Sequence, residues 1–238
     1  MKPIRAATVL PAHRTRVELR TEDGLKLVGE LAMPLRPARA TLIMVHPLTV
    51  AGGAMDSHVL SKVANRLPAL ADLAVFRFNL RGAASFEGCS EGQFDDGQGE
   101  QLDVRAAIEL AVAQELPNPW LVGWSFGAEL ALKCGPDQAV VGAVLIAPPL
   151  FLTTAEDLAS WDRTGKPLHV VVPEYDDFLR PAQARQQFAP VRQATVVTLE
   201  ETGHGVIGEP SVRRVLDEIV SVVAPQVPTP LPTQFSAG

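Results

Sequence analysis

The sequence predicts an α/β protein built around one twisted, mostly parallel sheet with helices on both faces. From residue 40 onward, short continuous apolar runs alternate with segments whose apolar residues recur at helical spacing. Such runs are typical of strands buried on both faces of a parallel sheet, which right-handed crossovers connect. Two earlier β-rich segments, separated by a turn that contains glycine, predict an antiparallel hairpin ahead of the parallel part.

Eight strands are expected in chain order. The hairpin takes residues 15–21 and 26–33, with the turn EDGL between them. The six apolar runs predict buried strands at residues 40–46, 73–79, 120–124, 140–147, 168–172 and 194–199. Helical spacing predicts helices at residues 57–70, 99–116, 126–134, 155–161, 181–188 and 210–223. Ligands of such sheets bind at the carboxyl ends of the strands, so the loops there are the place for a site.

Length and composition are typical of one soluble globular domain. The chain has 238 residues, of which 47% are hydrophobic and 20% charged, and α/β proteins often reach this length around a single sheet. We therefore expect one domain over residues 1–224. Residues 225–238 contain four prolines and few large apolar groups, which predicts an extended, disordered tail.

Charge and hydropathy exclude several classes of partner. The net charge of −6 disfavours nucleic acid, because a phosphate backbone requires clustered Lys and Arg. The longest apolar run, residues 139–152, contains two prolines and is shorter than the ~18 residues that suggest a membrane span. Prolines and an arginine interrupt the N-terminal stretch where a signal peptide would be apolar. We expect a cytoplasmic protein.

A candidate nucleophile lies in residues 123–127, GWSFG, which fit the pattern G-x-S-x-G. In this pattern a tight turn between a strand and a helix exposes the serine hydroxyl above the sheet. Ser125 follows a predicted buried strand and precedes a predicted helix, which is the required context. The alternative is that Ser125 caps the helix by accepting a backbone hydrogen bond.

A serine nucleophile needs a base, and that base needs an orienting acid. Two histidines follow Ser125, and the order of the residues in proteins with this turn is serine, acid, histidine. His169 enters a strand before any suitable acid, so His204, in a glycine-flanked loop after the last strand, is the candidate base.

The acid should lie in the loop after the preceding strand. That loop offers Glu174, Asp176 and Asp177. A carboxylate bonded to the imidazole fixes its tautomer and stabilises the imidazolium. Spacing alone does not separate Asp176 from Asp177, and any of the three acids can instead cap a turn or the following helix.

Two backbone N–H groups are candidates for the oxyanion hole. Phe126 directly follows the nucleophile and supplies the first. The loop after the strand at residues 40–46 supplies the second, for which the Leu48 N–H is the natural choice. We expect His46, at the end of that strand, to be satisfied by backbone groups rather than to act in catalysis.

Several ordered motifs together resemble a known superfamily. They are VHPLTVAGGAMDSHV, the segment VFRFNLRGAASFEGCSEGQFDDGQGEQLDVRAA, GWSFGAELAL, APPL, PEYDDFLRP and TGH. Over roughly residues 15–222 the chain is similar to the α/β-hydrolases, and within them to small, lidless bacterial serine hydrolases related to dienelactone hydrolase. The resemblance implies the α/β-hydrolase fold and no cofactor or metal.

The resemblance also implies roles for three residues. Ser125 is the nucleophile, His204 the base and Asp176 the acid, because the aspartate of the pattern G-x-x-D-x-[FIV]-V-x-P aligns with Asp176. This chain has Pro173 in place of the glycine and Leu179 in place of the valine. Dienelactone hydrolase uses a cysteine nucleophile, so the serine argues against that particular activity.

The segment FNLRGAASFEG contains Arg81, for which we expect a structural role. Arg81 is predicted to pair with Asp95, Asp96 and Glu100 in the Gly-rich loop that follows, and so to hold that loop against the sheet. The glycines of this loop do not fit a nucleotide fingerprint. No nucleotide site is expected.

About twenty residues separate the strands that end near residue 146 and begin near residue 168. This length accommodates a short helix but no lid, so the site should be open. Leu48, Phe126, Pro149, Leu150 and Phe151 are expected to form a shallow apolar wall. Among them, Leu150 and Phe151 are the candidate substrate contacts.

The sequence thus predicts a serine hydrolase that cleaves a small-molecule carboxylic ester or thioester through an acyl-enzyme. Activity should rise with pH, because the base must be neutral. Two alternatives remain. An acyltransferase shares the first half of the reaction, and a binding or scaffold protein can keep the same fold without turnover.

Overall fold

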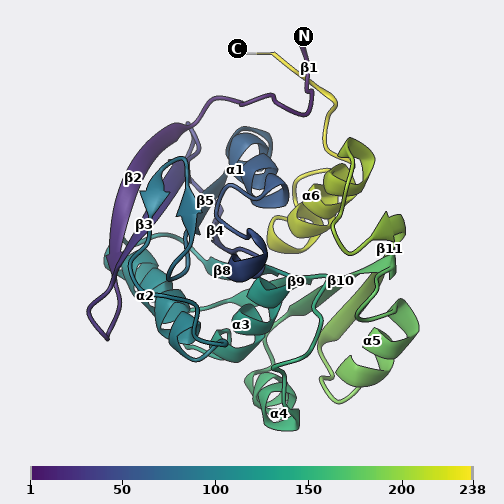
Figure 1. Cartoon of the computed structure of the whole chain (residues 1–238). Coiled ribbons are helices and arrows are strands. Elements are labelled where there is room, and N and C mark those ends of the chain that lie inside the picture. Colours follow the sequence, from purple (N-terminus) through teal and green to yellow (C-terminus); the bar gives the residue numbers. More distant parts are fainter. Residues whose placement is uncertain (1, 237–238) are drawn as a thin grey trace.

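The computed structural model of the protein describes residues 2–236. Its centre is an eight-stranded sheet in the order β11-β10-β9-β8-β4-β5-β3-β2 (Figure 1). The strands are β2 (His13–Arg20), β3 (Lys26–Met33), β4 (Ala40–Val45), β5 (Leu73–Phe78), β8 (Pro119–Trp124), β9 (Gly142–Ile146), β10 (Leu168–Tyr175) and β11 (Ala194–Gly203). The six strands from β4 onward pair in parallel. β2 and β3 form the antiparallel hairpin, and β3 joins the rest by pairing antiparallel with β5.

Helices cover both faces of the sheet (Figure 1). α1 (His58–Ala71) and α6 (Glu209–Val223) pack on one face. α2 (Gly99–Ala113), α3 (Phe126–Cys134) and α5 (Pro181–Phe188) pack on the other, and α4 (Ala155–Thr164) lies against α3. The predicted sheet, hairpin and two helical layers are confirmed.

Each face of the sheet has its own hydrophobic core. In β4, Leu42 and Met44 belong to the core under α1 and α6, whereas Ile43 and Val45 belong to the core under α2 and α3. All four are fully buried. Successive side chains of a strand point to opposite faces, so a strand covered on both sides must be apolar at every position. This explains why the central strands have unbroken apolar sequences.

Short elements beyond those predicted complete the chain. β6 (Ala84–Ser85) and β7 (Gly88–Cys89) form a small hairpin, and a 3₁₀ helix spans Thr49–Ala51. β1 (Lys2–Pro3) pairs with β12 (Gln234–Phe235). None of the helices within residues 2–236 has both the length and the apolar character needed to cross a bilayer.

The segment after α6 follows an extended path but is held to the domain. Leu231 is 4% exposed, its N–H donates to Asp217 at 2.7 Å, and its carbonyl accepts from Arg213 at 2.6 Å. A Pro-rich composition does not reveal this docking, because it depends on one leucine and on backbone groups. Residues 237 and 238, the end of the tail that the sequence analysis expected to be disordered, lie outside the described residues.

The structural role of Arg81 is confirmed, but its predicted partners are wrong. Its guanidinium binds Asp103 at 2.8 Å and Asp23 at 3.0 Å. Asp103 lies one turn further along α2 and is fully buried, so it attracts the cation into the protein. The carboxylates of the following loop instead accept backbone N–H groups within that loop, Glu100 from Gly97 and Asp95 from Gly99.

Candidate active site

Ser125 occupies the turn between β8 and α3 in a strained backbone conformation. Its φ is 56° and its ψ is −121°, a region that costs about 1–3 kcal/mol for a residue other than glycine. Surrounding hydrogen bonds hold it there: the Ser125 N–H donates to the Ile146 carbonyl at 2.8 Å. The hydroxyl does not cap α3, which removes the alternative interpretation of this serine.

The two glycines around the serine allow three backbone segments to meet. A Cβ on Gly123 would lie 2.1 Å from the Gly127 carbonyl oxygen. A Cβ on Gly127 would lie 2.2 Å from the carbonyl oxygen of Val45 in β4. No side chain larger than hydrogen fits these approaches, so the pattern G-x-S-x-G is a steric requirement of this turn.

Three side chains from three different loops form a continuous hydrogen-bonded chain. Ser125 Oγ lies 2.9 Å from His204 Nε2, and His204 Nδ1 lies 2.9 Å from Asp176 Oδ2. Because the carboxylate can only accept, Nδ1 carries the proton, and Nε2 of the neutral ring accepts from the hydroxyl. The three residues follow β8, β11 and β10, whose carboxyl ends lie at one edge of the sheet.

Asp176 is held in place by more than the imidazole. It is 1% exposed, and its Oδ1 accepts the Phe178 N–H at 2.8 Å and the Leu179 N–H at 3.2 Å. Burial alone would raise the pKa of Asp176, but the hydrogen bonds from His204 and from the two amides hold it below its ordinary value. Asp177, next along the chain, is exposed.

The loop that contains His204 rests on aromatic and histidine side chains that sequence reasoning missed. Trp124 Nε1 donates to the His204 carbonyl at 3.4 Å. The ring of His58 packs edge-on against Trp124, with centroids 5.0 Å apart, and its Nε2 donates to the Val206 carbonyl at 3.2 Å. The ring of Phe178 lies 4.5 Å from that of His204. Trp124 precedes the nucleophile in the motif, which is the one signal the sequence offered.

His46 is buried and bound by backbone groups, as predicted. The Leu80 N–H donates to its Nε2 at 2.9 Å, so Nδ1 carries the proton and donates to the Pro47 carbonyl at 2.6 Å. Burial lowers the pKa of His46 to about 4. The Pro47–Leu48 peptide is trans, so the Leu48 N–H points away from the carbonyl that His46 holds.

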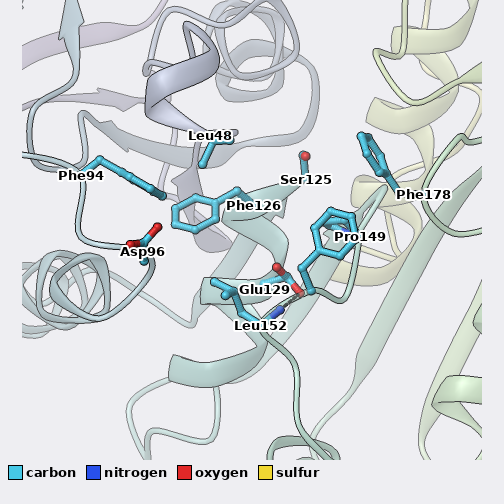
Figure 2. A pocket seen from close by; sticks show the side chains of 10 residues that line it. Leu48, Phe94, Asp96, Ser125, Phe126, Glu129, Pro149, Leu152 and Phe178 are labelled. Atoms are coloured by element: carbon cyan, nitrogen blue, oxygen red, sulfur yellow. Dashed lines mark hydrogen bonds between the residues drawn. The ribbon is translucent and has the colours of Figure 1, made fainter.

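Leu48 and Phe126 carry the two N–H groups that are predicted for the oxyanion hole. Both residues line the same cavity as Ser125, and Figure 2 shows them next to each other on one side of it. Within residues 2–236, neither N–H donates to another protein group. The two donors are therefore free to bind an oxygen atom of a ligand.

A cavity of about 220 Å³ opens at Ser125 (Figure 2). Its lining is Leu48, Phe94, Asp96, Ser125, Phe126, Glu129, Pro149, Phe151, Leu152 and Phe178. This volume is below the ~300 Å³ at which pockets for drug-sized ligands begin, so it suits a small group. Five of these residues were not predicted to line the cavity, namely Phe94, Asp96, Glu129, Leu152 and Phe178. Four of them lie in loops, whose paths local sequence spacing does not reveal. Only Glu129, one helical turn after the serine, had a signal in its spacing.

The structure brings Phe151 to this cavity but not Leu150. Leu150 lines a neighbouring cavity, together with Leu158 and Leu179. Its φ of 61° turns the chain, so that it faces away while Pro149 and Phe151 face the serine. Spacing in the sequence could not reveal this turn.

The connection between β9 and β10, residues 147–167, contains α4 and no covering element. Since α4 packs against α3, it lies beside the cavity rather than over it. Among the described residues, no group of three or more His, Cys, Asp or Glu side chains is arranged to hold a metal ion.

No family model matches the chain. A curated protein of Rickettsia prowazekii (strain Madrid E), itself uncharacterized, is 31% identical over 131 residues. That match covers 52% of this chain and 52% of the relative, so the chain spans about half the length of the curated protein it matches.

Solved structures resemble the chain over nearly its whole length. XC6422 from Xanthomonas campestris, an α/β serine hydrolase without a lid, has a TM-score of 0.75 and 25% identity over 93% of this chain and 98% of its own. An α/β serine hydrolase homologue from Coxiella burnetii has a TM-score of 0.70 and 26% identity over 90% and 97%. The Pyrococcus furiosus esterase Pf2001 shares the fold at 19% identity, with a TM-score of 0.71 over 92% and 98%.

The chain is therefore an α/β protein with the α/β-hydrolase fold. Within that fold it is similar to the lidless serine hydrolases, as its motifs predicted.

Proposed function

We propose that this protein is a serine hydrolase that cleaves a carboxylic ester or thioester, with Ser125 as nucleophile, His204 as base and Asp176 as orienting acid. One observation carries the proposal. The hydroxyl, the imidazole and the carboxylate form an unbroken chain in which both heavy-atom distances are 2.9 Å, the range in which a proton can pass between a nucleophile and its base.

In the first half of the reaction, Ser125 Oγ forms a bond to the acyl carbon and its proton passes to His204 Nε2. The electron pair of the carbonyl moves onto its oxygen, which the N–H groups of Leu48 and Phe126 stabilise. The carbonyl then reforms, the bond from carbon to the leaving oxygen or sulfur breaks, and His204 returns its proton to the leaving group. The acyl group remains as an ester of Ser125.

In the second half, His204 takes a proton from water, whose oxygen attacks the acyl carbon. The bond to Ser125 Oγ breaks, the hydroxyl recovers its proton from the imidazolium, and the carboxylic acid leaves. The lowered pKa of Asp176 supports its role here. The carboxylate stays ionised at neutral pH, keeps the proton of the neutral ring on Nδ1, and stabilises the imidazolium in each step.

The test is the variant Ser125→Ala with a p-nitrophenyl ester as substrate. We expect its kcat to fall by about 10⁴-fold or more, because the nucleophile of a triad is lost. A fluorophosphonate probe should label the wild type at Ser125 and leave the variant unlabelled. Full turnover by Ser125→Ala would contradict the mechanism, and a wild type that resists labelling would favour a binding protein.

Two further measurements define the reaction. A matched pair of an ester and a thioester with the same acyl group separates the two substrate classes. Product analysis with an added alcohol or amine separates a hydrolase, which releases the free acid, from an acyltransferase, which passes the acyl group to the acceptor.

A further inference from the structure

Glu129 is a buried carboxylate in the wall of a mostly apolar cavity. It is 1% exposed and lines the same cavity as Ser125, together with the rings of Phe94 and Phe126. It lies four residues after Ser125 on α3, about one helical turn away. Polar groups in such a lining fix the orientation of a ligand and confer specificity.

Only one oxygen of Glu129 has a protein partner. Oε1 accepts the Leu152 N–H at 2.8 Å and the Thr153 hydroxyl at 3.3 Å. Within residues 2–236, Oε2 accepts no hydrogen bond. Figure 2 shows the carboxylate among the lining side chains, with one oxygen toward Leu152 and the other pointing away from it. Because Glu129 lines the cavity, a ligand that carries a donor can supply a hydrogen bond to this second oxygen.

The charged side chains that line the cavity are both acidic. Asp96, which is exposed, is a second acidic residue in the lining, and no Lys or Arg belongs to it. The nearest lysine along α3, Lys133, is paired with Asp157 at 2.7 Å. A negative group on a ligand would meet this carboxylate pair without a compensating cation, whereas a positive group would be attracted.

We propose that Glu129 selects acyl groups that carry a hydrogen-bond donor, above all a protonated amine, a few bonds from the carbonyl, and that it rejects acyl groups with a carboxylate there. This inference rests on the proposed function, since it places the acyl group of the substrate in the cavity next to Ser125. In that position the free oxygen of Glu129 accepts from the amine while the ester carbonyl stays at the serine.

The test uses four p-nitrophenyl esters of matched size, each corrected for spontaneous hydrolysis. Their acyl groups are 3-aminopropionyl, 3-hydroxypropionyl, butyryl and malonyl. We expect the kcat/KM of the wild type to be about tenfold higher for 3-aminopropionyl than for butyryl, with 3-hydroxypropionyl between them and malonyl lowest. Equal kcat/KM for the malonyl and 3-aminopropionyl esters would overturn the inference without any variant.

The variant Glu129→Gln keeps an acceptor for the Leu152 N–H and places its NH₂ donor at the cavity in place of the second carboxylate oxygen. We expect the ratio of 3-aminopropionyl to butyryl turnover to fall about tenfold, and the ratio of malonyl to butyryl turnover to rise. The control Glu109→Gln makes the same change at an exposed site on α2 and should keep both wild-type ratios. If Glu129 only anchors Leu152 and Thr153, the variant loses stability with its ratios unchanged, which would overturn the inference.

The failure of the proposed function is a separate result. If none of the four esters is hydrolysed and the fluorophosphonate probe leaves Ser125 unlabelled, both proposals fall. If butyryl is hydrolysed with no preference that depends on Glu129, the hydrolase stands and the specificity is wrong.

Discussion

Asp176 and Asp177 are adjacent aspartates with opposite surroundings. Asp176 is buried and accepts from His204 and from two backbone amides. Asp177 is exposed. Spacing in the sequence treats them alike, because which one faces the histidine depends on how the chain turns after β10. The Phe178 and Leu179 N–H groups donate to Asp176 Oδ1 and so hold this carboxylate, rather than that of Asp177, toward the histidine.

The pair therefore offers a matched experiment on the proposed acid. We expect Asp176→Asn to lower kcat by about 10⁴-fold, since an amide that donates to His204 would favour the wrong tautomer of the ring. Asp177→Asn should retain the wild-type rate. Steady-state kinetics with a p-nitrophenyl ester measures both, and circular dichroism checks that both variants fold. Equal losses in the two variants would remove Asp176 from the proposed triad.

The residues of the candidate site were predictable where a motif or the order along the chain left a single candidate of the required residue type. The turn at Ser125 has a motif, and chain order leaves His204 as the one histidine in position. Phe94 and Phe178 reach the cavity from the loops before α2 and α5, whose paths no local spacing encodes. The position of Leu150 was also not predictable from spacing, because its single positive φ turns its side chain to the neighbouring cavity.

Helices and strands long enough to display a period were predictable. The helices Phe126–Cys134 and Pro181–Phe188 have the predicted bounds. The first is buried along almost its whole length, and the second packs Ala184 and Phe188 into a core. The strands β1, β6, β7 and β12 have two residues each, and two residues cannot display an alternation. Their pairing depends on which segments the rest of the fold brings together.

The segment that ends in β12 should contribute to stability through Leu231. We expect Leu231→Ala to lower the free energy of unfolding by about 2 kcal/mol, because its buried side chain fills a site next to α6. Denaturant titration measures this change. The control Leu35→Ala removes the same atoms from a side chain that is 62% exposed and should have almost no effect. Similar losses in both variants would mean that the docked segment adds no stability of its own.

At the scale of the whole molecule, two cores share one sheet, and unfolding exposes both. His46 links this global stability to pH. It is fully buried at the end of β4, and burial lowers its pKa from 6.5 to about 4. The unfolded chain therefore binds a proton between these values that the folded protein does not bind.

Stability should accordingly fall as the pH decreases from about 6.5 to about 4. Protonation of Nε2 would also break the hydrogen bond from the Leu80 N–H. The contribution of His46 is on the order of 3 kcal/mol at the acid end of this range. Urea denaturation of the wild type and of His46→Asn at several pH values isolates it, because other titrating groups contribute to both proteins. Parallel curves for the two proteins would show that His46 does not carry the dependence.

Because the connection between β9 and β10 is short, no element of it covers the cavity at Ser125 in the described chain. In hydrolases with hinged covers, opening and closing often set the pace of the cycle. Here the connection between β9 and β10 contains no such cover. Discrimination between substrates must then come from the shape and charge of the cavity itself. Water also reaches the acyl group on Ser125 as freely as substrate reaches the cavity.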